Sequence, residues 1–172
     1  MKQLRLFDEI NNEQEAPVKR KSVLWQLYVD GASRNNPGPS GAGIYIVKNG
    51  VAAEKHGFYL GKRTNNQAEY LALLLGIFFV KQQVQQGDFI EIVSDSQLLV
   101  RQLLGAYRVK NSELQPLHIL AKQLLAPTVH KIMHVLREKN VVADGLANKG
   151  IDEKIGVPDA FKKMLADHHI MF

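Results

Sequence analysis

The sequence predicts an α/β domain with a five-stranded mixed sheet, in which three antiparallel strands precede two parallel strands and helices flank the sheet. Three observations support this fold class. Strand-like apolar patterns come first, and helix-like spacing then alternates with two further strand-like runs. An Asn-Gly pair between the second and third runs is a strong hairpin signal. The later strands are separated by helical segments, and such crossovers make strands parallel.

The first predicted strand covers residues 23–30, where Trp25, Leu27 and Val29 lie on one face at period two. A loop over 31–41 leads into the predicted hairpin of residues 43–60, whose turn is Asn49-Gly50. These segments give the three antiparallel strands.

The first helix begins after Thr64, because Thr64 and Gln67 form a capping-box pattern. The pattern predicts an end near Gly87, where glycine favours helix termination. The helix is identified by apolar residues at helical spacing, namely Leu71, Leu74, Leu75, Phe78 and Phe79.

A buried fourth strand is predicted over 89–95, and the fifth over 128–137. Two helices lie between them, one over 96–104 and one over 111–125. The second of these helices has Asn111 or Ser112 as its candidate cap, with Pro116 in its first turn.

Asn140 is the candidate cap of a last helix over 141–150. The sequence therefore divides into a flexible polar leader (1–21), one domain (22–150) and a tail (151–172) that contains a short amphipathic helix.

The composition restricts the class of protein. A chain of 172 residues that is 45% hydrophobic fits one globular domain. The absence of cysteine excludes disulfides and thiolate metal sites, and the longest apolar stretch, residues 71–80, is too short to cross a bilayer. With no signal-peptide pattern, we expect a soluble, cytoplasmic monomer. A net charge of +5 gives weak support for a polyanionic partner.

Four acidic residues are the candidate site. Asp30 and Asp95 end strand-like runs, whereas Glu69 and Asp144 lie in the first turns of predicted helices, so all four can meet at one end of the sheet. Carboxylates gathered in this way need cations among them, and Mg²⁺ binds carboxylates together with water and phosphate oxygens. Each acid taken alone is equally compatible with a cap or a turn residue.

The motifs YVDGAS, NNPGPSGAG, TNNQAEY, SDSQ and ADGLAN occur in this order, and together they resemble the type 1 ribonuclease H family over residues 22–150. The resemblance implies a ribonuclease H-like fold. It implies that Asp30, Glu69, Asp95 and Asp144 hold two Mg²⁺ or Mn²⁺ ions. It also implies an endoribonuclease that cuts the RNA strand of RNA–DNA hybrids and leaves 5′-phosphate and 3′-hydroxyl ends.

The resemblance further implies a set of contacts to the hybrid. Asn36, Asn65, Asn66 and Gln97 would lie along its minor groove, and Thr64 with Asn66 would seat a phosphate of the DNA strand. Short amides suit the 2′-hydroxyl, which distinguishes RNA from DNA. The alternative is ordinary turn and cap chemistry, since Asn36-Pro37 is a good turn and Thr64 a good cap.

Two departures from the family pattern are visible. Many relatives carry a histidine in a loop before the last acid, whereas here Arg137-Glu138-Lys139-Asn140 takes that place, as in a short-loop variant. Arginine does not transfer protons at neutral pH, so no general base is assigned. The basic protrusion of some relatives is absent too, because only GAYRVK separates Leu104 from Asn111.

The segment Gln3-Leu4-Arg5-Leu6-Phe7 resembles the peptide with which bacterial proteins bind the sliding clamp. Leu6 and Phe7 would fill an apolar pocket, while Gln3 would hydrogen-bond at its rim. The alternative is a terminus with chance hydrophobic residues, or a strand packed on the domain.

Two other functions remain open at this point. A catalytically silent hybrid-binding scaffold would be expected to lack one of the acids, and all four are present. The second alternative is another ribonuclease H-like DNA nuclease, such as a junction resolvase or a transposase-type domain, which cutting assays on hybrid, junction and duplex DNA would distinguish.

Overall fold

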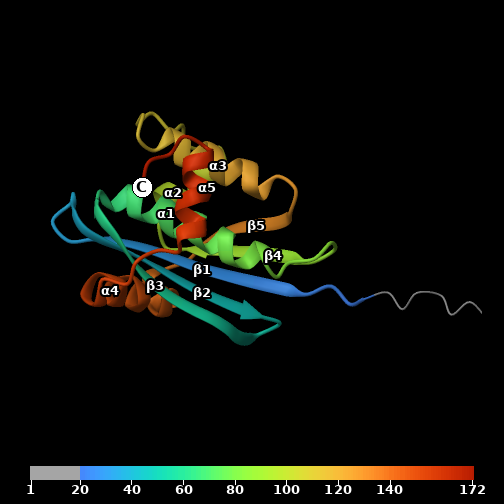
Figure 1. Cartoon of the computed structure of the whole chain (residues 1–172). Coiled ribbons are helices and arrows are strands. Elements are labelled where there is room, and N and C mark those ends of the chain that lie inside the picture. The colour runs from blue at the N-terminus through green and yellow to red at the C-terminus, as the bar shows by residue number, and fades with distance from the viewer. Residues whose placement is uncertain (1–19) are drawn as a thin grey trace, which may run out of the picture.

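The computed structural model describes residues 20–172 and contains one mixed sheet with the strand order β3-β2-β1-β4-β5 (Figure 1). The strands are β1 (Leu24–Ser33), β2 (Gly38–Lys48), β3 (Val51–Arg63), β4 (Phe89–Ser94) and β5 (Val129–His134). The helices are α1 (Asn65–Lys81), α2 (Gln97–Leu103), α3 (Gln115–Leu125), α4 (Val141–Glu153) and α5 (Asp159–Asp167), and a 3₁₀ turn covers Arg137–Lys139. Strands β1, β2 and β3 are antiparallel, whereas β4 and β5 run parallel to β1. The predicted fold class is confirmed.

The β2–β3 hairpin closes through the predicted two-residue turn. Asn49 has a φ of 49° and Gly50 a φ of 81°, and two positive φ angles are what a type I′ turn requires. The Asn49 side chain also accepts a hydrogen bond from the Leu24 amide at 2.8 Å, which joins the turn to the start of β1. Local sequence therefore sets the register of the antiparallel half of the sheet.

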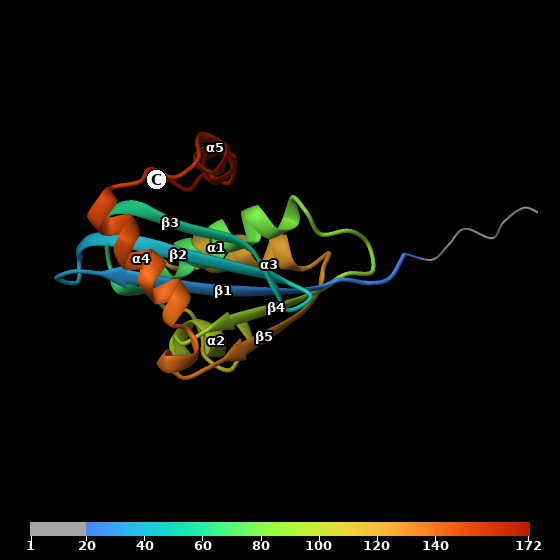
Figure 2. The ribbon, with the colours of Figure 1, turned by 90° about the horizontal axis from the view of Figure 1, so that it is seen from below.

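Helices cover both faces of the sheet (Figures 1 and 2). Trp25, Leu27 and Val29 of β1 are buried on the face that carries α1 and α3. Helix α5 packs on the same side, where the rings of Phe161 and Phe78 are 5.7 Å apart. The other face carries α4, which lies against β1, β2 and β3.

Helix α4 approaches the sheet closely because glycine lies beneath it. A Cβ on Gly43 would stand 1.8 Å from the carbonyl oxygen of Ala143, so any larger residue would push α4 outward. Close contact between α4 and β2 fixes where the first turn of α4, and with it Asp144, lies relative to the ends of β1 and β4.

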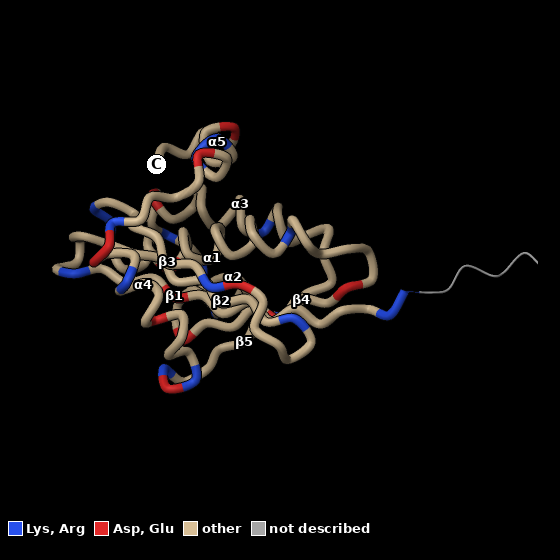
Figure 3. Tube along the Cα trace, turned by 60° about the horizontal axis from the view of Figure 1, so that its bottom comes forward, with Lys and Arg blue, Asp and Glu red and all other residues tan. Residues whose placement is uncertain are grey.

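Lysine and arginine positions are spread over many elements and alternate with acidic positions (Figure 3). Several are paired with acids, as in the ion pairs Arg34–Asp152 at 2.7 Å and Lys163–Asp167 at 2.9 Å. The positive net charge is thus dispersed rather than concentrated on one helix face.

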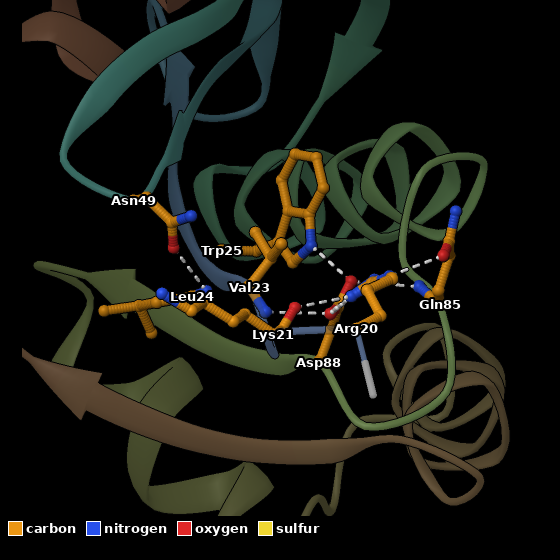
Figure 4. Close-up of polar contacts among 8 residues, drawn as sticks. All are labelled: Arg20, Lys21, Val23, Leu24, Trp25, Asn49, Gln85 and Asp88. Atoms are coloured by element: carbon orange, nitrogen blue, oxygen red, sulfur yellow. Dashed lines mark hydrogen bonds and ion pairs between the residues drawn. The ribbon is translucent and has the colours of Figure 1, made fainter. Parts of the chain in front are cut away.

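Asp88, in the turn before β4, holds the start of the described chain (Figure 4). Its carboxylate accepts hydrogen bonds from Arg20 at 2.7 Å, the Val23 amide at 2.9 Å, the Trp25 indole at 3.0 Å and the Gln85 amide at 3.0 Å. Burial by itself would raise the pKa of Asp88, but these hydrogen bonds and the Arg20 charge lower it below its usual value. Arg20 was predicted to belong to the leader, yet it contacts the domain.

Helix α1 ends earlier than the sequence predicts. Thr64 and Gln67 form the predicted capping box, but the last helical residue is Lys81 rather than one near Gly87. The following run QQVQQG offers only Val84 to the core, so little apolar burial supports further turns. Gly87 instead adopts a φ of 89° in the turn that leads into β4.

Several other boundaries differ from prediction: β2 begins at Gly38, inside the predicted loop, and α4 extends to Glu153, past the predicted end at residue 150. Helix α3 starts at Gln115, because the Asn111 side chain accepts from the amides of Glu113 and Leu114 and so caps a preceding turn. Pro116 lies in the first turn of α3, as predicted. Strand β5 is shorter than predicted, and β1 extends past Asp30 to Ser33. Among residues 20–172, no helix is both long and apolar enough to span a bilayer.

Candidate active site

Asp30 and Asp95 lie side by side because their strands are parallel neighbours. The last paired residues of β1 and β4 are Tyr28 and Val93, and each acid follows two positions later. Asp30 is buried inside β1, whereas Asp95 comes directly after β4 and is partly exposed. The expectation that Asp30 ends its strand was wrong, but the expectation that the two acids meet at one end of the sheet is confirmed.

Glu69 reaches these two acids from α1. The Gly31 amide donates a hydrogen bond to Glu69 Oε2 at 3.0 Å in a buried contact. This contact depends on glycine, because a Cβ on Gly31 would stand 2.2 Å from the backbone nitrogen of Glu69. The Thr64–Gln67 capping box starts α1 at Asn65. Glu69 therefore lies in the second turn of the helix, where it contacts Gly31 of β1.

One oxygen from each of Asp30, Glu69 and Asp95 lies within 4.8 Å of the others. Asp144, in the first turn of α4, stands outside that trio and forms an ion pair with Arg137 at 2.8 Å. All four acids nevertheless line a single open cleft of about 310 Å³, which Asn65, Asn148 and Arg137 also line. The structure thus brings the four predicted acids together from four separate segments.

The trio is electrostatically unfavourable without a cation. Burial is the largest cause that raises the pKa of Asp30, and together with the charges of Asp95 and Asp144 it brings that pKa to about 7. Burial also raises the pKa of Glu69, with Asp30 and Asp95 adding to the shift and the Gly31 amide opposing it. Oxygen donors crowded in this manner fit a hard divalent cation, which would relieve their mutual repulsion.

Asn140 contacts this site in a way that the sequence did not indicate. It occupies the N-cap position of α4, as predicted, but its side chain caps no amide among residues 20–172. Its Nδ2 instead donates to the Val29 carbonyl at 2.9 Å and to Asp95 Oδ1 at 3.0 Å. A cap-type residue directly before an acid-bearing helix was the only sequence signal available.

The candidate hybrid-binding residues lie in two groups around the cleft. Thr64, Asn65 and Asn66 begin α1, and Asn36 Oδ1 accepts from the Asn65 amide at 2.9 Å, which brings the β1–β2 loop to the same corner. Gln97 is the first residue of α2, close in sequence to Asp95. Asn36, Asn66 and Gln97 are exposed, and Asn65 lines the cleft.

The segment before α4 forms a tight 3₁₀ turn, Arg137–Lys139, as expected of a short connection. A histidine does lie nearby, but it comes from β5. The ring nitrogen Nε2 of His134 is 3.2 Å from the backbone carbonyl oxygen of Asp95, not from its carboxylate. This contact gives no geometric basis for assigning His134 as a general base.

Comparison with known proteins places this architecture in a family. Residues 28–150, a range that includes all four acids, match the family model described as "Reverse transcriptase-like". Ribonuclease HI of Halobacterium salinarum is 41% identical over 130 residues, which are 73% of this chain and 63% of that protein. The bifunctional protein Rv2228c of Mycobacterium tuberculosis is 35% identical over 131 residues, which are 73% of this chain and only 35% of that longer protein.

Other relatives are matched over nearly their whole length. Ribonuclease H of Coxiella burnetii is 33% identical over 151 residues, covering 79% of this chain and 95% of that protein. The crystal structure of RNase H1 from Halobacterium salinarum has a TM-score of 0.72 at 38% identity, covering 76% of this chain and 98% of that one. LC11-RNase H1 in complex with RNA/DNA hybrid has a TM-score of 0.69 at 32% identity, covering 77% of this chain and 98% of that one. The chain therefore belongs to the type 1 ribonuclease H family.

Proposed function

We propose that this protein is an endoribonuclease that hydrolyses the RNA strand of RNA–DNA hybrids with divalent metal ions, leaving 5′-phosphate and 3′-hydroxyl ends. The observation that carries the proposal is the meeting of Asp30, Glu69 and Asp95 within 4.8 Å in a cleft that Asp144 also lines. The solved hybrid complex of LC11-RNase H1, a relative over 98% of its length, supports the choice of substrate.

In this proposal the four acids hold two Mg²⁺ ions, with Mn²⁺ as an alternative. When bound, such ions activate water and stabilise the leaving oxygen of a phosphodiester. The chain itself supplies the positions of the oxygens. The Gly31 amide fixes Glu69, and Asp30 is held within a paired strand. Arg137 pairs with Asp144 at 2.8 Å, and both side chains line the cleft.

The decisive experiment compares substrates and metals. Purified protein with Mg²⁺ or Mn²⁺ should cut a labelled RNA–DNA hybrid and leave RNA–RNA and DNA–DNA duplexes intact, and Asp95→Asn should abolish cutting. Hybrid binding without cutting in both metals would contradict the proposal and favour a scaffold. Cutting of DNA junctions would instead identify a DNA nuclease.

For hybrid recognition we propose Asn36, Thr64, Asn65, Asn66 and Gln97. Their support is placement: Asn65 lines the acid cleft, and the others lie at the starts of α1 and α2 and in the loop that contacts Asn65. Asn66→Ala and Gln97→Ala should raise KM for hybrid several-fold and leave kcat nearly unchanged, because exposed amides contribute binding rather than chemistry. Equal KM values for these variants and the parent would contradict the assignment.

Thr64 needs a separate test because it also caps α1. Thr64→Ser keeps the capping oxygen and removes only a methyl group, whereas Thr64→Ala removes the cap and should cost about 1 kcal/mol of stability. If Thr64 also seats a phosphate, Thr64→Ala should raise KM beyond what its loss of stability explains, while Thr64→Ser should not.

We also propose that Gln3, Leu4, Leu6 and Phe7 bind a bacterial sliding clamp, although these residues lie outside the described part of the chain. Compatibility with catalysis is supported by the path of β1, because the chain enters the domain at Val23, beside Asp88, whereas Asp30 lies further along the strand. The six residue steps from Leu24 to Asp30 span about 20 Å at roughly 3.3 Å per step. Pull-down with purified clamp, comparing the intact chain with Leu6→Ala/Phe7→Ala, tests the idea, and failure of both to bind would end it.

A further inference from the structure

The amide of Asn140 occupies a position between the two acid-bearing strands. Pairing between β1 and β4 ends at Tyr28 and Val93. Just beyond that point, Asn140 Nδ2 donates to the carbonyl of Val29 and to the carboxylate of Asp95. The Asn140 side chain thus links Val29 to Asp95 at a point where the backbones of β1 and β4 no longer pair.

Burial makes this bridge specific. Asn140 is only 1% exposed, so its two amide hydrogens have little access to water and are directed to the two acceptors. Its Oδ1 is buried and has no hydrogen-bond partner among residues 20–172. An unpaired buried oxygen costs free energy, which a residue selected only to cap α4 would not need to incur.

The chemistry of the donor also matters. A lysine or arginine in this position would neutralise Asp95 and compete with a metal ion. A neutral amide binds Oδ1 and leaves the negative charge intact, so the remaining oxygen, Oδ2, stays available as a ligand. Hydrogen bonds to ligating carboxylates orient them and typically change metal affinity or activity by 10–100-fold when removed.

From these contacts we infer that Asn140 is a positioning residue for the metal site: it fixes the carboxylate of Asp95 against β1 and so sets the separation of Asp95 from Asp30. The inference rests on the proposed function, because it assumes that these acids bind the ions. It assigns to Asn140 no contact with substrate and no proton transfer.

The first test measures metal affinity without substrate. Mn²⁺ binding by calorimetry should weaken about 10–100-fold in Asn140→Ala. In kinetics, the metal concentration for half-maximal activity should rise, kcat at fixed low metal should fall and recover as metal is added, and KM for hybrid should stay unchanged. Asn140→Leu, which fills the vacated volume without donors, should show the same loss.

Asn49→Gly provides a matched control. Asn49 also hydrogen-bonds the backbone of β1, but its side chain accepts from the Leu24 amide (Figure 4), six positions before Asp30 in the strand. Glycine accepts the positive φ of that turn. Asn49→Gly should therefore lower Tm and leave Mn²⁺ affinity at the parent value. Parent-like Mn²⁺ affinity in both Asn140 variants would overturn the inference.

A second measurement needs no substitution and applies even if the Asn140 variants do not fold. In the NMR spectrum of the intact protein, the side-chain amide signals of Asn140 should shift as Mg²⁺ is added, together with the backbone amide signal of Gly31, which bonds Glu69. A shift of Gly31 without Asn140 would overturn the role of Asn140. If neither signal moves and Mn²⁺ does not bind the parent protein, the proposed metal site itself fails.

Discussion

The backbone amide of Gly31 and the carboxylate of Glu69 form a buried hydrogen bond of 3.0 Å that joins β1 to α1 at the acid cleft. The contact exists because the two backbones approach more closely than any side chain at residue 31 would permit. The position of one ligand oxygen therefore depends on the absence of a Cβ on the neighbouring strand.

Gly31→Ala should consequently damage both stability and metal binding. The added Cβ would meet backbone atoms of Ala68 and Glu69 at 2.2 Å, so α1 must move. Overpacking of this kind costs about 1–3 kcal/mol. Chemical denaturation and Mn²⁺ titration measure the two effects. Gly145→Ala is the matched control, because its Cβ would meet open space in α4 and should be neutral or stabilising.

Asp30→Asn should stabilise the metal-free protein at pH 8. The pKa of Asp30 is about 7 in the folded protein and 3.8 ordinarily, so between these values the folded state keeps a proton that the unfolded chain has released. Stability therefore falls as pH rises through this window, by on the order of 2–4 kcal/mol. The substitution removes the charge of residue 30 at nearly constant side-chain volume. Denaturation at pH 5 and pH 8 measures the change.

A control for that pH experiment is Asp159→Asn, whose carboxylate is almost fully exposed. It should leave the pH dependence of stability unchanged. If Asp30→Asn and Asp159→Asn gave the same pH profile as the parent, Asp30 would not be the group that destabilises the metal-free fold.

Divalent metal should raise Tm, and more at pH 8 than at pH 5. An ion that binds only the folded state stabilises it by mass action, and at pH 5 protons on Asp30 and Glu69 compete with the ion. Thermal melts with Mg²⁺, Mn²⁺ or EDTA measure this gain. Asp95→Asn should lose most of it, and an equal gain in the parent and in Asp95→Asn would place the ion elsewhere.

Asp88→Ala should cost much more stability than Arg20→Ala. Asp88 is buried and accepts from four residues, so its removal leaves the Trp25 indole and two backbone amides without an acceptor, at roughly 3–5 kcal/mol. The Arg20 side chain is 41% exposed, and its pair with Asp88 should be worth about 1 kcal/mol or less. Denaturant titrations of both variants measure the difference.

The pH dependence of the Asp88 contribution has the opposite sign to that of Asp30. The pKa of Asp88 is lowered in the folded protein, so its stabilising effect is present above the ordinary carboxyl pKa and disappears as pH falls through the lowered value. Hybrid cutting per folded molecule should remain at the parent level in Asp88→Ala, because Asp88 lies at the other end of β1 from the cleft. Loss of cutting in fully folded Asp88→Ala would contradict that separation.

The order of elements, the Asn49-Gly50 hairpin turn, the capping box at Thr64 and Gln67, and the identity of the four acids could all be predicted before the fold was known. These features could be predicted because each depends on residues close together in the chain, where turn angles, caps and apolar periodicity act directly. The predicted end of α1 was wrong because helix termination there depends on how much apolar surface the core can bury. The polar run after Lys81 contributes little such surface.

The contacts that position those acids arise only in the folded protein. Asn140 is 111 residues from Val29 and 45 from Asp95, and Asp88 is 68 residues from Arg20, so no local pattern encodes either set of hydrogen bonds. The fold also separates Asp144 from the trio of Asp30, Glu69 and Asp95 and pairs it with Arg137. A buried polar group takes whichever partner the packed fold brings within reach, and that choice exists only once the sheet and α4 have come together.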